Sequence, residues 1–268
     1  MSSLSFEPEQ ESASSRKNVG EEMTDFGYRR VPAREKAGFV LRHFNSIAGK
    51  YDFMNTVLSL GIHHRWKIQA VSALGLKPGD LVLDVCGGTA DLTILAAKIA
   101  GPKGHVVLYD INRAMIEEGI PKVSRASLDD LVSCVQGDAE YISFPSGRFD
   151  AVMIGFGIRN VTHMDHGLAE CYRVLKTGGK FMCLEFSLPT DAWFRFLYDF
   201  YSFRIMPLAG KILAGTWDAY IHLPETIRKF PPPGVFAAML RNAGFSAVTY
   251  RRLSNGIAII YTGVKKWS

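Results

Sequence analysis

The stretch LVLDVCGGTADLT, residues 81–93, decides the fold of this chain. Residues 81–86 form a near-continuous apolar run with β-branched members, which is typical of a buried parallel strand. Gly87 and Gly88 then form a turn of small residues that opens onto a helix. Such a turn lets the backbone approach a ligand closely and points free N–H groups at it, so we predict a nucleotide-type pocket. An ordinary strand-to-helix turn is the alternative, because glycine is a general turn former.

Strands and helices alternate regularly after this first strand. The expected elements are helix 90–100, strand 105–110, helix 112–124, strand 131–136, strand 149–154, helix 164–175 and strand 179–186. Alternation of this kind implies right-handed crossovers and a doubly wound sheet with helices on both faces. We therefore predict an α/β fold of the Rossmann-like type.

The segments that flank this core follow other patterns. Residues 34–50 and 62–74 carry apolar positions at helical spacing, which predicts N-terminal helices. Residues 188–232 interrupt the alternation with aromatic residues and prolines, and we interpret them as an inserted helical cap over a substrate. The expected C-terminal elements are helix 234–243 and strands 246–253 and 256–264, joined at Ser254, Asn255 and Gly256. Because an Asn-Gly pair suits a tight turn, the last two strands should form an antiparallel hairpin.

Length and composition favour one compact domain. With 268 residues, of which 47% are hydrophobic, the chain can bury one sizeable core, and we place that domain at residues 26–268, with N-terminal helices in 26–75. Residues 1–25 are rich in Ser and Glu and lack an apolar run, which predicts a disordered tail. The same residues resemble neither a secretory signal nor a transit peptide, and no stretch suits a membrane span, so a cytoplasmic protein is expected.

The distribution of charges and the spacing of Cys and His residues argue against a nucleic-acid-binding protein and against a metal site. The formal charge of +5 is scattered along the chain, so it predicts no nucleic-acid partner. The four cysteines are widely spaced and fit reduced thiols, and no His or Cys cluster has the spacing of metal ligands, so no metal is expected.

Acidic residues follow three of the expected strands. Asp84 lies near the end of the first strand, Asp110 ends the second and Asp138 follows the third. These side chains should meet at one edge of the sheet, where an acid can bind both hydroxyls of a ribose. For Asp138, acceptance from an adenine amino group and capping of a turn are both open. A dehydrogenase would also place an acid here, but its pyrophosphate requires GxGxxG, whereas this turn reads GGTAD.

The order of these features resembles the S-adenosylmethionine site of class I methyltransferases, which have a seven-stranded fold with a reversed C-terminal hairpin. Three further segments narrow the family. They are YDFMNTVLSLGIHHRW at 51–66, GFGIRNVT at 155–162 and RVLKTGGKFMCLEFS at 173–187. All three resemble signatures of the ubiquinone/menaquinone biosynthesis C-methyltransferases, and the similarity runs from about residue 26 to residue 265.

The resemblance implies a cofactor, S-adenosylmethionine, and a set of residues that hold it. By this likeness, Asp84, Gly87 and Thr89 shape the methionine end of the pocket, Asp110 holds the ribose, and Asp138 with Ala139 holds the adenine. The implied reaction is C-methylation of a prenylated quinol ring in menaquinone or ubiquinone biosynthesis, of the demethylmenaquinol-to-menaquinol type. Another small aromatic acceptor is the alternative. The chain departs from the family at Cys86, where Ala or Gly is usual, and at Ala90, where Gly is usual.

Methylation of a ring carbon requires stabilisation of a phenolate oxygen and a route for a proton. Arg159, after the fourth strand, is our candidate for the oxyanion role, and the alternative is a structural arginine paired with an acid. His63 and His163 are candidates for proton transfer. The aromatic run 193–201 is expected to line the path of a polyprenyl tail, and its basic residues to favour a peripheral position on the membrane. The sequence leaves the quinone, the tail length and a homo-oligomeric state open.

Overall fold

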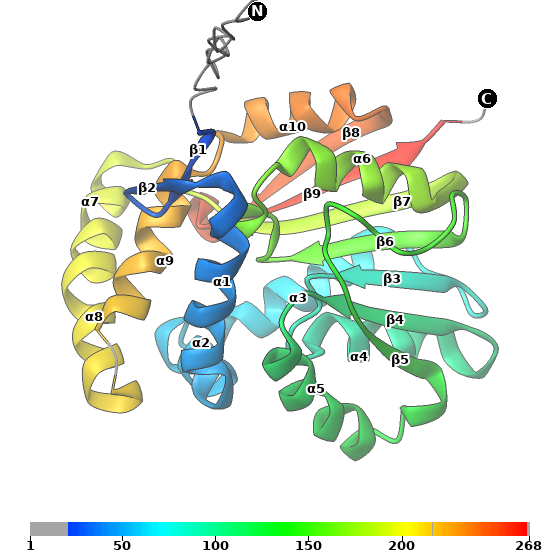
Figure 1. Ribbon diagram of the computed structural model, residues 1–268, viewed down its shortest axis with the longest axis horizontal. Helices are drawn as coiled ribbons and strands as arrows, with labels where there is room; N and C mark the ends of the chain where they lie inside the picture. The colour runs from blue at the N-terminus through cyan, green and yellow to red at the C-terminus, as the bar shows by residue number, and fades with distance from the viewer. Residues whose placement is uncertain (1–20, 216, 267–268) are drawn as a thin grey trace, which may run out of the picture.

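A seven-stranded sheet forms the centre of the computed structural model, which describes residues 21–215 and 217–266 (Figure 1). Its strand order is β5-β4-β3-β6-β7-β9-β8. The strands are β3 (Leu81–Val85), β4 (His105–Asp110), β5 (Val132–Gln136), β6 (Phe149–Gly155), β7 (Leu175–Phe186), β8 (Phe245–Leu253) and β9 (Ala258–Lys265). Strand β9 runs antiparallel to both of its neighbours, β7 and β8, and the other neighbouring strands of this sheet are parallel. The predicted Rossmann-like fold with a reversed C-terminal hairpin is therefore confirmed.

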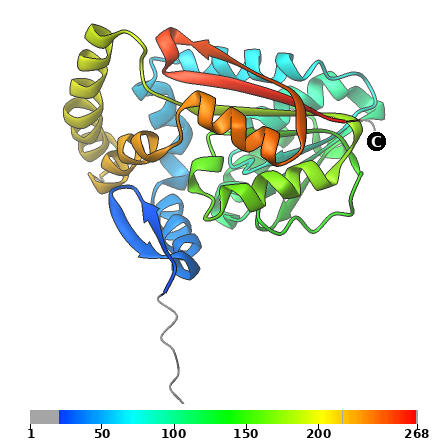
Figure 2. The ribbon, with the colours of Figure 1, turned by 90° about the horizontal axis from the view of Figure 1, so that it is seen from above.

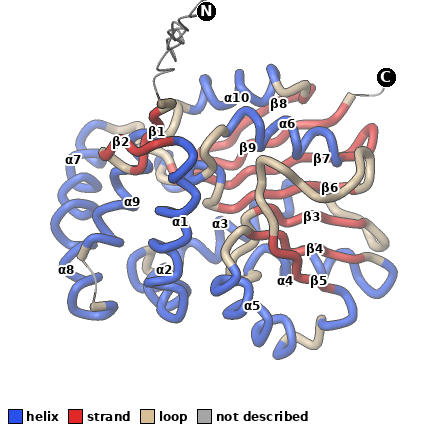
Figure 3. Tube along the Cα trace, viewed as in Figure 1, coloured by secondary structure: helices blue, strands red, loops and turns tan. Residues whose placement is uncertain are grey.

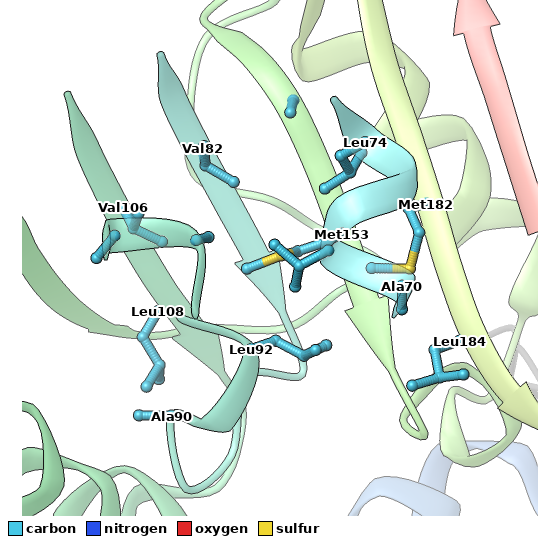
Figure 4. Close-up of a cluster of buried hydrophobic side chains, with 14 of the residues drawn as sticks. Ala70, Leu74, Val82, Ala90, Leu92, Val106, Leu108, Met153, Met182 and Leu184 are labelled. Carbon is cyan, nitrogen blue, oxygen red and sulfur yellow. The ribbon is translucent and has the colours of Figure 1, made fainter. Parts of the chain in front are cut away.

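Helices cover both faces of the sheet (Figure 3). They are α3 (Ile62–Leu74), α4 (Asp91–Ala100) and α5 (Arg113–Arg125) on one face and α6 (Met164–Val174) and α10 (Pro233–Asn242) on the other. Successive residues of β3 serve opposite faces, because Val82 packs in the cluster with Leu92 (Figure 4), whereas Leu83 and Val85 pack in the other cluster. Burying such a side chain contributes roughly 1.5–3 kcal/mol, so the central strands are a rigid base for what lies at their ends.

The N-terminal region differs from the sequence-based expectation in two ways. Residues 23–25 do not belong to a disordered tail, because β1 (Met23–Phe26) pairs with β2 (Arg29–Pro32) in an antiparallel hairpin. Residues 1–20 of the predicted tail lie outside the described residues. The expected helix 34–50 ends early, as α1 (Ala33–Ile47), and a 3-10 turn leads from it into a separate helix, α2 (Tyr51–Leu58).

The segment expected to form a cap is helical. It contains α7 (Ala192–Phe200), α8 (Met206–Ala209) and α9 (Asp218–Lys229), and π-helical segments Tyr201–Ile205 and Gly210–Ala214 flank α8. Figures 1 and 2 show these helices together with α1 and α2 at one end of the sheet. Among the described residues, no helix is both long enough and apolar enough to cross a membrane.

Candidate active site

A pocket lies at the carboxyl ends of the central strands, and we call it the strand-edge pocket. Helix α1 contributes Ala37, Val40 and Phe44 to its wall. The wall also contains all six residues predicted to bind the cofactor, namely Asp84, Gly87, Thr89, Asp110, Asp138 and Ala139. The structure thus brings the six together, because the carboxyl ends of parallel strands meet at one edge. Their roles in cofactor binding stay a prediction.

The turn between β3 and α4 has a backbone that favours glycine. A Cβ atom added at Gly87 would lie 2.9 Å from Leu108 Cγ and 3.1 Å from the carbonyl oxygen of Asp84, so a side chain does not fit there. Cys86 and Ala90 adopt left-handed conformations, with φ of 57° and 70°, although both carry a Cβ. Each such residue costs roughly 1–2 kcal/mol, so both positions carry backbone strain that glycine would relieve.

Only one oxygen of the Asp84 carboxylate accepts a hydrogen bond from a described residue. Its side chain is fully buried, and its Oδ2 accepts a hydrogen bond from the Thr93 hydroxyl at 2.6 Å. Its Oδ1 is buried and has no hydrogen-bond partner among the described residues. Burial raises the pKa of Asp84 to about 7. A buried oxygen without a donor at a pocket wall fits a cationic ligand group, such as an amino group.

Asp110 connects the turn to the next helix. Its Oδ2 accepts from the Gly88 backbone N–H at 2.9 Å and its Oδ1 from the Asn112 N–H at 2.7 Å. Burial raises the pKa of Asp110 to about 6. The Asn112 side chain caps α5 by accepting from the Met115 N–H, and it donates to Asn45 of α1. Each Asp110 oxygen keeps lone pairs for further donors, as binding of a ribose diol would require.

Asp138 and His163 belong to a different set of contacts. Asp138 Oδ1 accepts from the Glu140 N–H at 2.9 Å, so this aspartate caps a turn as well as facing the pocket. Glu140 in turn contacts His163 Nδ1 at 2.7 Å, and this hydrogen bond raises the pKa of His163. His163 does not line this pocket, and it does not line the larger neighbouring cavity that contains Arg159. The structure therefore does not bring this candidate for proton transfer to the site.

A network of lysines and aspartates joins the N-terminal helices to the glycine-rich turn. Thr89 donates its hydroxyl to Asp52 Oδ1 of α2 at 2.6 Å, and Lys122 of α5 binds both Asp52, at 2.5 Å, and Asp91. Lys67 of α3 binds Asp91 at 2.6 Å. Burial opposes the effect of the two lysines on Asp91, whose pKa nevertheless lies well below its ordinary value. The network fixes α2, α3 and α5 around the first turn of α4.

Two clusters of possible metal ligands occur near the pocket. The first contains His63, His64 and Asp91, and the second contains Glu140, His163 and His166. In both, the carboxylate already has partners, namely the lysines at Asp91 and the imidazole of His163 at Glu140. Ion pairs of this kind compete with a metal ion, so these clusters of described residues do not indicate a dedicated metal centre.

A larger cavity of about 590 Å³ lies beside the strand-edge pocket, and we call it the apolar cavity. The two share Phe44, Tyr51, Lys67, Phe156 and Asn160 in their walls. The rest of the wall is mostly apolar and comes from α1, α2, α3, α7, α9 and the turn before β9. The arrangement can therefore hold a small polar ligand and a bulky apolar one side by side.

Arg159 lies in the wall of the apolar cavity, in the 3-10 turn that follows β6. Its Nη1 donates to Glu185 Oε1 at 2.6 Å and to the carbonyl oxygen of Phe156, and only 7% of its side chain is exposed. Burial raises the pKa of Glu185, and the guanidinium opposes this shift. Both readings of Arg159 thus have support, because it is paired with a buried acid and faces the cavity.

Two further histidines of this cavity have no signal in the sequence that marks them as candidates. His43 of α1 and His222 of α9 both line it, with ring centroids 4.6 Å apart. Burial, aided by the charge of Arg159, lowers the pKa of His43 to about 4. Burial, aided by His43 and Arg159, lowers that of His222 to about 3. His63, which was a candidate, also lines the cavity, but its Nε2 contacts the Thr56 hydroxyl at 3.2 Å.

Comparison with models of known protein families matches the sequence to one of them. The model of the ubiE/COQ5 methyltransferase family matches residues 31–265, which is most of the chain. The chain belongs to the ubiE/COQ5 methyltransferase family. The family assignment made from the motifs at 51–66, 155–162 and 173–187 is thereby confirmed. Arg159, Glu185 and the glycine-rich turn all lie within the matched residues.

Individual relatives that align with most of the chain carry the name of the same family. The chain is 45% identical over 245 residues to the ubiquinone/menaquinone biosynthesis C-methyltransferase UbiE of Ectopseudomonas mendocina, covering 91% of this chain and 96% of the relative. It is 43% identical, with the same coverage, to UbiE of Pseudomonas paraeruginosa. This ubiE/COQ5 family member is therefore a methyltransferase whose relatives act in quinone biosynthesis.

Solved structures support the fold alone. A SAM-dependent methyltransferase from Thermotoga maritima aligns with a TM-score of 0.59 at 17% identity, over 84% of this chain and 99% of that one. The [4+2]-cyclase SpnF aligns with a TM-score of 0.63 at 13% identity, over 85% and 96%. Because a cyclase has the same fold, the reaction of the ubiE/COQ5 member has to be argued from its site.

Proposed function

We propose that this methyltransferase moves a methyl group from S-adenosylmethionine to a ring carbon of a prenylated quinol, as in menaquinone or ubiquinone biosynthesis. The observation that carries the proposal is the junction of two spaces, an acid-lined strand-edge pocket and an apolar cavity of about 590 Å³. The first suits a nucleoside with a charged amino group, and the second suits a ring with an isoprenoid tail. The name of the relatives, ubiquinone/menaquinone biosynthesis C-methyltransferase, agrees with this reaction.

The residues of the strand-edge pocket fit the cofactor. Asp84 Oδ1 is a buried acceptor to which no described residue donates, as a bound amino group requires. Asp110 keeps acceptor capacity for two ribose hydroxyls, and the missing side chain at Gly87 allows close approach. Asp138 and Ala139 line the same pocket, and we assign them to the adenine. When bound, the cofactor supplies an electrophilic methyl group on a sulfonium.

The walls of the apolar cavity prepare the acceptor. Arg159 offers a permanent positive charge in the wall of the apolar cavity, next in sequence to Asn160, which lines both spaces. There it would stabilise the oxygen of a quinol as that oxygen becomes negative. Glu185 holds the guanidinium in place through the 2.6 Å hydrogen bond. The surrounding aromatic side chains, such as Phe156 and Phe186, exclude water and strengthen this interaction.

The outer face of α7 supports a second part of the proposal, a lipid bilayer as the partner from which the substrate enters. Phe194, Leu197 and Tyr198 of this helix line the apolar cavity. Its outer face exposes Trp193 by 70% and Phe196 by 64%, so apolar residues occupy both faces. A short helix of this kind that does not span a membrane suits the interface of one. Exposed basic residues on the same segment, Arg195, Arg204 and Lys211, suit anionic headgroups.

A vesicle assay tests the membrane partner. The double variant Trp193→Ser, Phe196→Ser should lose most of its sedimentation with vesicles of phosphatidylglycerol and phosphatidylethanolamine. Tyr141→Ser, which removes an aromatic side chain that is 72% exposed outside the cap, should keep it. Equal binding by all three proteins would refute the assignment of this face.

A transfer assay tests the substrate class. The chain is incubated with radiolabelled S-adenosylmethionine and, in separate reactions, demethylmenaquinol, the matching ubiquinol precursor and each ring without its tail. We expect transfer to at least one prenylated quinol, with a much higher kcat/KM than for the same ring without its tail. Transfer that is as efficient without the tail would support a small aromatic acceptor instead.

A further inference from the structure

Two histidines from distant parts of the chain meet in the wall of the apolar cavity. His43 lies on α1 and His222 on α9, and their rings are 4.6 Å apart with planes inclined by 54°. Phe26 of β1 packs on His222 with ring centroids 4.0 Å apart, and Phe44 forms a T-shaped pair with His43 with ring centroids 5.0 Å apart. Aromatic side chains thus fix both imidazoles in position.

Within residues 21–215 and 217–266, neither imidazole has a hydrogen-bond partner. Among the described residues, no side chain or backbone group makes a hydrogen bond to a ring nitrogen of His43 or His222. None of these nitrogens is among the fully enclosed polar atoms without a partner, and both residues line the cavity. Nδ1 of His222 lies beside the β1–β2 turn, 3.1 Å from where a Cβ of Gly27 would be, so Nε2 is the nitrogen of His222 that a ligand in the cavity would meet. A polar group in an apolar wall costs stability unless something bonds to it. Two such groups side by side point to a polar part of a ligand.

The charges around the pair fix what it can offer. Arg159 is close enough to lower the pKa of both imidazoles, and the other charged neighbours that affect His222 are also cationic, Lys36 and Arg29. Both rings are therefore neutral near pH 7, and each has one N–H donor and one bare nitrogen acceptor. Arg159 can only donate. The bare nitrogens of the histidines can therefore accept a hydrogen bond from a hydroxyl group of a ligand.

We propose that His43 and His222 bind a free ring hydroxyl of the quinol and so make the site specific for the hydroxylated, reduced ring. The inference rests on the proposed function, because it takes a quinol as the ligand of the apolar cavity. In this arrangement the hydroxyl donates to an imidazole nitrogen, while the Arg159 guanidinium donates to a quinol oxygen. The histidines are substrate-binding residues that determine specificity and take no part in bond making.

A pair of probes isolates the hydroxyl group. One is a short-tailed prenyl-1,4-naphthoquinol kept reduced with dithionite, and the other is its dimethyl ether, which cannot donate a hydrogen bond. Binding of each is measured by calorimetry in the presence of S-adenosylhomocysteine. One hydrogen bond of about 1 kcal/mol corresponds to roughly fivefold in affinity, so the unaltered chain should prefer the quinol by about fivefold or more.

The variants remove the acceptors but keep the packing. In His43→Phe, His222→Phe the preference should vanish, because the quinol binds more weakly while the ether is little affected. In His43→Gln, His222→Gln, whose amides still accept hydrogen bonds, part of the preference should return. His105→Asn, outside both cavities, is the matched control and should keep the full preference. Unchanged affinity for S-adenosylhomocysteine shows that each variant is folded.

Two results would overturn the inference. One is an unaltered chain that binds quinol and ether alike, and the other is a phenylalanine variant that weakens both by the same factor, which would mean that the histidines only fill space. The proposed function has a separate outcome. Preference for the quinol without any methyl transfer to it would refute the proposed reaction and support the role of the histidines.

Discussion

Replacing the buried acid Asp84 by asparagine should stabilise the free protein and abolish its pH-dependent binding of the cofactor. The carboxylate is fully buried, one of its oxygens has no partner among the described residues, and burial raises its pKa from 3.8 to about 7. Between these two values the unfolded chain releases the proton and the folded chain retains it. The free energy of unfolding therefore falls with rising pH from about 4 to about 7 and is constant above.

The size of this effect follows from the pKa difference. A shift from 3.8 to about 7 at 1.36 kcal/mol per unit makes the charged carboxylate cost up to about 4 kcal/mol of folding free energy at pH 8. Asparagine keeps an acceptor for the Thr93 hydroxyl and carries no charge, so the variant avoids this cost. A cationic amino group of the cofactor offsets the same cost when it binds beside Asp84.

Urea denaturation at pH 5 and pH 8 measures the difference. Asp84→Asn should be more stable than the unaltered chain at pH 8, and the gap should narrow at pH 5. The affinity of the unaltered chain for S-adenosylhomocysteine should fall as pH drops below about 7, whereas the variant should bind weakly at every pH. A variant that is less stable at pH 8, or that binds as tightly as the unaltered chain, would refute this reasoning.

Three further changes test the other parts of the site. Arg159→Leu should lower kcat by about 100-fold or more, because the developing oxyanion loses its positive charge. It should also destabilise the fold by about 3 kcal/mol, because Glu185 is left buried and unpaired. Adding Glu185→Leu should restore the free energy of unfolding but not turnover, and recovered turnover would contradict the oxyanion role. Lys122→Met removes the bridge between two aspartates. The variant should lose about 2 kcal/mol of unfolding free energy in urea denaturation and bind S-adenosylhomocysteine more weakly. Unchanged stability and affinity would show that the network is dispensable. Gly157→Ala would place a Cβ 2.3 Å from Cys86 Cβ and should lower the free energy of unfolding by about 1–3 kcal/mol. Adding Cys86→Gly should recover most of this loss. An unchanged Tm for Gly157→Ala would count against this packing.

The sheet was predictable because buried parallel strands are apolar runs between turn residues. Strand β4 has the predicted bounds, 105–110, and most other strands begin or end within one or two residues of the prediction. Strand β7 begins earlier than expected, at Leu175, because that residue pairs with Phe149 across a register shift. A bulge of this kind depends on the partner strand and has no signal in the strand's own sequence.

The N-terminal hairpin and the separate helix α2 were not predictable in the same way. Strands β1 and β2 have four residues each and are mostly exposed or half-buried, so they show no apolar alternation. The helical pattern of 34–50 continues through the 3-10 turn Ala48–Lys50, which hides the break between α1 and α2. Local propensity does not reveal a change of direction that tertiary contacts impose.

In the site, the residues near the strand ends were predictable and the long-range partners were not. Asp84, Asp110 and Asp138 meet because parallel topology brings strand ends to one edge. The meeting of His43 with His222 depends on how α9 packs against α1, which no local pattern encodes. The same holds for Lys122, whose two aspartates come from α2 and α4.

The position of the new methyl group tests the central claim most directly. The chain is supplied with S-adenosylmethionine carrying a ¹³C-labelled methyl group and with demethylmenaquinol or the matching ubiquinol precursor, and the product is examined by NMR. Our account predicts a label bonded to a ring carbon of a prenylated quinol. A label on a quinol oxygen, or cofactor binding without transfer to either quinol, would contradict it.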